Sequence, residues 1–69
     1  MKDINNKEIR VGDTVKTMQE SGGILPPAPA RIGVVELKDG LMVVKYKQEG
    51  DEFYRFILLE GKINTVLSN

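Results

Sequence analysis

The side chains best suited to bind a ligand are cations close to an aromatic ring, namely Lys45, Lys47, Phe53 and Arg55. Bases of a single-stranded nucleic acid stack on exposed aromatic rings while neighbouring cations bind the phosphates. The same residues also fit a solvated strand surface on which the two lysines pair with Glu36 and Glu52, and exposed ion pairs contribute little. The cluster therefore predicts either a nucleic-acid patch or an ordinary polar surface.

The residue types on which most catalytic and metal sites depend are missing, because the chain contains neither His nor Cys. Their absence excludes disulfides, thiolate and imidazole metal ligands, and Cys or Ser–His nucleophiles. The carboxylates of Glu49, Asp51 and Glu52 surround Gly50, but their spacing does not match a calcium-binding loop. We therefore expect an exposed acidic turn there, and a protein without enzymatic activity, metal or cofactor.

The overall charge favours a protein partner over nucleic acid. Ten Lys and Arg residues balance ten Asp and Glu residues, so the net charge is zero. Non-specific nucleic-acid binding grows with the number of phosphates neutralised. No apolar run approaches the ~20 residues of a membrane span, and residues 1–6 lack the apolar segment of a signal peptide. We expect a cytoplasmic protein without membrane contact.

Residues 19–30 form a long loop rich in Gly and Pro, which is a second candidate for partner binding. Loops of about 12 residues without secondary structure are uncommon in small domains and are often functional. Pro26, Pro27 and Pro29 form a PxxP-like segment of the kind that partner domains bind as polyproline II. Simple stiffening of the loop is the alternative explanation. Ile24 and Leu25 either pack on the domain or contact a partner.

Short strands must position these residues, because no window of the chain shows helical periodicity. The pattern predicts strands at 14–18, 31–38, 41–47, 53–58 and 63–67, and an N-terminal arm or small hairpin at 1–8. Asp39 and Gly40 predict a two-residue hairpin turn. The resulting register pairs Lys38 with Leu41, Leu37 with Met42, Val35 with Val44, and Gly33 with Tyr46. Leu37, Val35, Met42, Val44 and Tyr46 then share the core face.

The opposite face of this hairpin carries Val34 and Val43, which together with Leu41 predict a small exposed apolar stripe. Such a stripe indicates a protein contact, including one with a second copy of the chain, or coverage by the N-terminal arm. The fourth strand has two possible registers. We prefer the one in which Tyr54, Phe56 and Leu58 face the core, because the other register buries an unpaired Arg55.

Five short strands in one domain of 69 residues require a closed or nearly closed small barrel, because an open sheet leaves long edges and a naked apolar face. We therefore expect an all-β domain over residues 1–69, with residues 19–30 as its long first loop.

The order of motifs resembles the SH3-like small barrels, including the KOW-type barrels of ribosomal and transcription proteins. The motifs are the apolar-x-x-Gly-Asp-x-Val segment at 9–15, the Arg-Ile-Gly-Val-Val segment at 31–35, and Asp39-Gly40 followed by Val43-Val44-Lys45-Tyr46. The resemblance implies a five-stranded barrel with a variable first loop and a one-turn helix within 57–62. KOW-type barrels bind RNA or the ribosome, but here Pro residues replace the Lys-Gly run of the loop.

Barrels of this size and opening are also similar to small phage and prophage proteins such as the YorP-like family. Together these observations predict a protein-interaction module, with an RNA-binding or single-strand-binding barrel as the alternative. A third hypothesis is a subunit of an enzyme, whose carboxylate-only site would form only by assembly with another chain.

Overall fold

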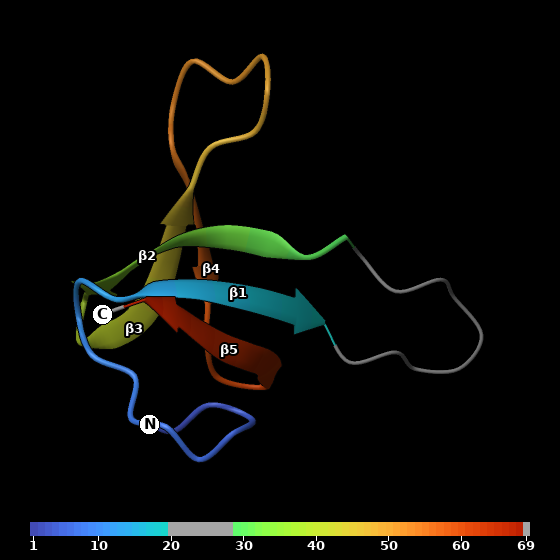
Figure 1. Ribbon diagram of the computed structural model, residues 1–69. Coiled ribbons are helices and arrows are strands. Elements are labelled where there is room, and N and C mark those ends of the chain that lie inside the picture. Colours follow the sequence, from blue (N-terminus) through green and yellow to red (C-terminus); the bar gives the residue numbers. More distant parts are fainter. Residues whose placement is uncertain (20–28, 69) are drawn as a thin grey trace.

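Five antiparallel strands form one sheet in the computed structural model, which describes residues 1–19 and 29–68 (Figure 1). The strands are β1 (Thr14–Gln19), β2 (Arg31–Lys38), β3 (Leu41–Tyr46), β4 (Arg55–Leu58) and β5 (Lys62–Ser68). Their order in the sheet is β4-β3-β2-β1-β5. The all-β class with five strands is thus confirmed. The described residues include no helix long and apolar enough to cross a membrane.

The β2–β3 hairpin follows the register that its turn predicts. Asp39 and Gly40 both have positive φ, 53° and 80°, as a type I′ turn requires. Three of the expected pairs are present, from Lys38 with Leu41 to Val35 with Val44, but the ladder ends where Val34 pairs with Lys45. Gly33 is therefore not paired with Tyr46. A Cβ on Gly33 would overlap the Lys45 carbonyl oxygen and lie 2.7 Å from Val44 Cγ1, so this glycine marks a close approach of two strands.

The core lies on one side of the sheet. Its buried side chains are Ile9, Val15, Val35, Val44, Tyr46 and Leu59, and Met42, Ile57 and Val66 pack against them. Leu37 was expected in this core but is exposed. It lies two residues from the hairpin turn, where the strands extend past the packed centre. Leu59, in the β4–β5 connection, is fully buried instead.

The register of β4 is the one that the sequence argument rejected. Ile57 pairs with Val44 and Arg55 with Tyr46, so Phe56 and Leu58 point away from the core and are exposed. The rejected register carried the cost of burying an unpaired arginine. Arg55 is in fact neither buried nor unpaired. Its side chain is 55% exposed, and its Nε donates to Asp51 Oδ2 at 2.9 Å.

The sheet is not closed, because β4 and β5 are its two edges. The N-terminal residues form a small hairpin, with a bridge between Lys2 and Glu8, and this hairpin covers the edge of β5. The Ile4 amide donates to the Asn64 carbonyl at 2.9 Å, and the Val66 amide donates to Asp3 Oδ2 at 2.8 Å. The one-turn helix expected within 57–62 is replaced by the end of β4 and a turn at Glu60 and Gly61.

Candidate binding surface

The side of β2, β3 and β4 that faces away from the core forms a mixed apolar and basic surface, here called the outer face. Because side chains alternate along a strand, the register places one residue of each strand in a row, such as Val34, Lys45 and Phe56. The outer face consists of Ile32, Val34, Glu36, Lys38, Leu41, Val43, Lys45, Tyr54, Phe56 and Leu58. Residues from both predicted surfaces therefore share one face.

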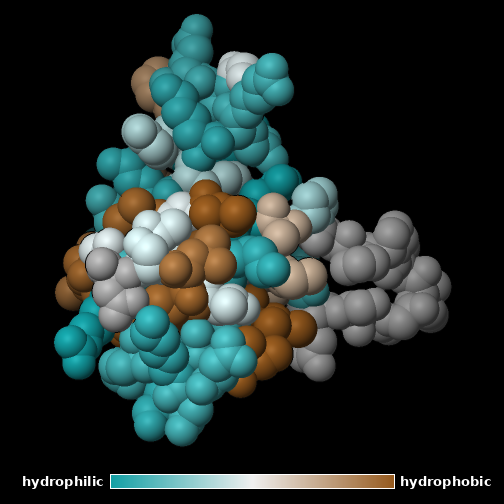
Figure 2. Space-filling model, in the orientation of Figure 1, coloured by the Kyte–Doolittle hydropathy of each residue, from teal (hydrophilic) through white to brown (hydrophobic). Residues whose placement is uncertain are grey.

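Six apolar or aromatic side chains of the outer face are exposed, by 41% to 57%. They are Ile32, Val34, Leu41, Tyr54, Phe56 and Leu58. Figure 2 shows the side on which β1, β2 and β5 lie nearest the viewer, and hydrophobic side chains also gather at the middle of this side, between the mostly hydrophilic 47–54 loop and the hydrophilic N-terminal hairpin. Grouped exposed apolar residues commonly mark an interaction site.

Lysine side chains lie against the aromatic rings of this face. Lys38 Nζ is 3.9 Å from the centroid of the Phe56 ring, and Lys45 Nζ is 4.4 Å from that of Tyr54. Lys47 Nζ lies 5.4 Å from the same Tyr54 ring, whereas the sequence suggested Glu52 as its partner. Each cation–π contact at an exposed site is worth about 0.5–1 kcal/mol. Among the described residues, these lysines thus lie over rings rather than in ion pairs with carboxylates, except that Lys45 Nζ also lies 3.8 Å from Glu36 Oε1.

The predicted nucleic-acid patch does not come together as a unit. Lys45 and Lys47 are neighbours, but Arg55 lies on the core side, where both its Nε and its Nη2 donate to the Asp51 carboxylate. The Arg55 guanidinium, with the Gln48 amide, holds the pKa of Asp51 below its usual value. Phe53 is 79% exposed and lies in the loop before β4.

Tyr54, rather than Phe53 or Arg55, is the residue that lies with Lys45 and Lys47. The sequence argument missed it because it placed this ring in the core. The sequence carried no local signal for this register, because the bidentate ion pair between Asp51 and Arg55 forms only through the geometry of the loop before β4.

The predicted Val34 and Val43 stripe is also corrected. Val34 is exposed, but Val43 is only 5% exposed. Val43 lies in a strand with a neighbouring strand on each side, opposite Glu36 of β2 and Leu58 of β4. The side chains of these neighbours cover it from solvent. The exposed apolar area is instead displaced toward β4, the edge strand.

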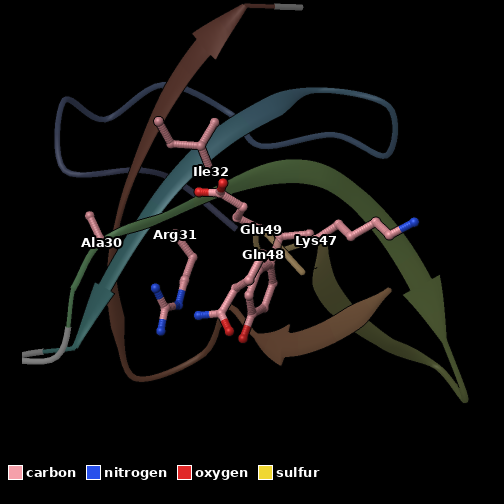
Figure 3. Close-up of a pocket in the computed structure, with 7 residues that line it drawn as sticks. Ala30, Arg31, Ile32, Lys47, Gln48 and Glu49 are labelled. Atoms are coloured by element: carbon pink, nitrogen blue, oxygen red, sulfur yellow. The ribbon is translucent and has the colours of Figure 1, made fainter. Parts of the chain in front are cut away.

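Two hollows lie beside each other where β2 leaves the long loop, and they share Arg31 and Tyr46. The larger, about 470 Å³, is shown in Figure 3 and is lined by Ala30, Arg31, Ile32, Tyr46, Lys47, Gln48 and Glu49. The Arg31 guanidinium lies 5.6 Å from the Tyr46 ring centroid. With the Gln48 amide oriented so that its oxygen accepts, Arg31 donates to it at 3.0 and 2.7 Å.

Of the loop residues expected to bind a partner, Pro29 is exposed and lines the smaller hollow. Ile24, Leu25, Pro26 and Pro27 lie outside the described residues. Within residues 1–19 and 29–68, no three carboxylates gather in a way that could hold a metal ion.

Comparison with protein-family models, with curated proteins and with solved structures gives no match. The resemblance to SH3-like barrels is therefore supported only as far as an all-β, five-stranded antiparallel fold. No support is found for a KOW-type, YorP-like or phage relationship.

Proposed function

We propose that this protein is a non-catalytic binding module that uses its outer face to dock a partner protein. The observation that carries the proposal is the group of six exposed apolar and aromatic side chains on β2, β3 and β4. Protein interfaces combine an apolar centre with a polar rim. Here Val34, Leu41 and Leu58 supply aliphatic surface that has no role in binding phosphates or stacking bases.

The charges around the apolar group indicate the chemistry of the partner. Lys38 and Lys45 lie on the outer face and Lys47 lies beside it, while Glu36 is its one acid among the described residues. A partner surface with an apolar centre and acidic residues at its rim would be complementary, because opposite potentials steer association and suppress wrong partners. We place this interaction in the cytoplasm, and a phage or prophage accessory role remains part of the proposal.

The test is affinity capture from lysate of the cells that encode the protein, with and without nuclease, followed by mass spectrometry. Phe56→Ser removes an aromatic anchor from the outer face, and loss of a good anchor costs about 2 kcal/mol, or about 30-fold in affinity. Val11→Ser is the matched control, since Val11 is also exposed but lies in the turn before β1. We expect a nuclease-resistant partner that Val11→Ser retains and Phe56→Ser loses. Equal recovery with both variants, or no recovered protein, would count against the proposal.

Single-stranded nucleic acid is a second candidate, favoured by the position of Lys45 and Lys47 against Tyr54. Loss of one stacked base costs about 1–3 kcal/mol, so Tyr54→Ala would weaken binding by about 5- to 150-fold. If Lys38, Lys45 and Lys47 each contact a phosphate, the logarithm of the binding constant should fall with the logarithm of the salt concentration with a slope of about −2. Fluorescence anisotropy with a labelled single-stranded RNA measures both, and an unchanged anisotropy at low salt removes this candidate.

A further inference from the structure

Strand β4 is an edge of the sheet, and its backbone groups point away from the sheet at alternate residues. The Leu59 amide donates to the Met42 carbonyl at 3.2 Å, and Ile57 is paired with Val44. In an antiparallel ladder, residues that bond to one neighbour alternate with residues whose N–H and C=O face the other side. Ile57 therefore bonds to β3, whereas Phe56 and Leu58 direct their N–H and C=O groups outward.

The two edges of the sheet are treated differently. At β5, the outward carbonyl of Asn64 and the outward amide of Val66 are satisfied by the N-terminal hairpin. At β4, the outward N–H and C=O groups of Phe56 and Leu58 have no hydrogen-bond partner among the described residues. Edge strands are commonly protected by Lys, Pro or a covering segment. The sequence of β4 has neither Lys nor Pro, and its single charge, on Arg55, is neutralised by Asp51.

We propose that the β4 edge pairs with β4 of a second copy of this chain, antiparallel, about a two-fold axis at Ile57. In this register Phe56 of each copy lies opposite Leu58 of the other. The outward N–H of each of these residues donates to the outward carbonyl of the other, so that they form a hydrogen-bonded pair. Ile57 lies opposite itself. The exposed side chains of Phe56 and Leu58 then cover each other, and such cross-strand apolar pairs stabilise a sheet.

Charge complementarity selects a second copy as the occupant. No like charges face each other in this register, because Arg55 lies opposite Leu59. One residue further along, the register brings Glu60 of one copy toward Tyr54 of the other. Lys45 and Lys47 lie over that tyrosine ring, so the carboxylate approaches two cations. The two outer faces would then adjoin in one continuous sheet.

Hydrogen exchange on the isolated protein tests the pairing without any partner. We expect a mass by sedimentation equilibrium that doubles with concentration, and amides of Phe56 and Leu58 whose exchange slows as the dimer forms. The amides of Arg55 and Ile57, which bond to β3, should be protected at every concentration. A protein that stays monomeric up to about 1 mM would overturn the proposal, because a dissociation constant above this value corresponds to a binding free energy weaker than about 4 kcal/mol. A dimer with fast exchange at Phe56 and Leu58 would also overturn it, because the contact would lie elsewhere.

A paired substitution separates the backbone from the side chain. Phe56→Pro removes an outward donor that β3 does not use, a position at which edge strands tolerate Pro, and it should abolish the dimer. Phe56→Val removes the same ring but keeps the amide and should retain it. Equal dissociation by both variants would contradict pairing through the backbone.

A cross-link gives an answer that does not depend on whether the Pro variant folds. The chain has no Cys, and Ile57→Cys would place two thiols opposite each other at the two-fold axis. Residues in such a non-hydrogen-bonded pair have Cα atoms about 4.5 Å apart, within the disulfide range of about 4.4–6.8 Å. We expect rapid formation of a covalent dimer for Ile57→Cys and slow formation for the exposed control Phe53→Cys. Equal rates would overturn the proposal, as would protection of Phe56 and Leu58 only after another protein is added.

Discussion

Gly33→Ala is expected to destabilise the fold, because β2 and β3 approach too closely at this position to admit a side chain. An added Cβ would overlap the Lys45 carbonyl oxygen and lie 2.7 Å from Val44 Cγ1 and 2.8 Å from the Lys45 carbonyl carbon. Carbon atoms in contact sit about 3.5–4.0 Å apart, so these separations are about 1 Å too short. The obstacle is backbone rather than the end of a flexible side chain, so relief requires the two strands to separate.

The magnitude follows from two opposing contributions. Replacing Gly by Ala within a strand gains about 0.5–1 kcal/mol because Gly loses more conformational freedom on folding. Overpacking a well-packed site costs about 1–3 kcal/mol, and occasionally more. The cost should dominate at Gly33, because Lys45 cannot retreat without weakening its pairing with Val34 in β2 and with Phe56 in β4.

Thermal unfolding followed by circular dichroism measures the result. For a domain of this size, each 1 kcal/mol of lost stability lowers Tm by about 4–8 °C. Gly50→Asn is a control without a clash, since a Cβ there meets no atom within 4 Å, although the φ of 88° strains any side chain. Asn tolerates positive φ better than most residues, so we expect a clear loss of Tm for Gly33→Ala and a smaller loss for Gly50→Asn. A Tm for Gly33→Ala at or above that of the unaltered protein would refute the close approach.

Three further changes test the core, a buried polar contact and an acid. Leu59→Ala, at a fully buried position, should cost about 2–5 kcal/mol in urea unfolding; a loss below 1 kcal/mol would contradict its place in the core. Thr17→Val leaves Asn64 Oδ1 without its 2.7 Å donor and should cost about 1–3 kcal/mol; an unchanged urea midpoint would show that the amide finds another donor. Hydrogen bonds, first from the Val66 amide, lower the pKa of Asp3 in the folded protein. The ionised carboxylate therefore adds to the free energy of unfolding above the ordinary pKa of Asp, and this contribution is lost as the pH falls through the lowered pKa of the folded state. Urea midpoints at several pH values should fall less steeply with acid for Asp3→Asn than for the unaltered protein, and parallel curves would contradict this.

Local signals made the β2–β3 hairpin predictable. Asp39 and Gly40 both occupy positive φ, and a two-residue turn fixes the facing of every residue that follows it. β4 lacks such a signal, because the 47–54 loop is long enough to allow either facing. Its register depends on whether Arg55 is paired, and only the geometry of the loop brings Asp51 within 2.9 Å of it.

The candidate surface was only partly predictable for a related reason. The alternation of β3 correctly placed Lys45 and Val43 on one face, but exposure also depends on which strands lie alongside. Val43 is buried because β3 has a neighbour on each side, whereas Phe56 and Leu58 are exposed because β4 is an edge. Strand order is a non-local property, so the sequence identified the outer face but not the position of its exposed apolar part.

The N-terminal hairpin connects the fold to the proposed pairing. A sheet with two open edges can add copies at both and grow into an open-ended assembly, whereas one open edge per chain allows a closed two-fold pair. Asp3 and Ile4 occupy the outward backbone groups of β5, so among the described residues β4 is the edge left to pair. In the proposed dimer, the buried carboxylate of Asp3 would therefore have a second role beside stabilising a turn, because the hairpin that it holds against β5 would limit edge pairing to two copies.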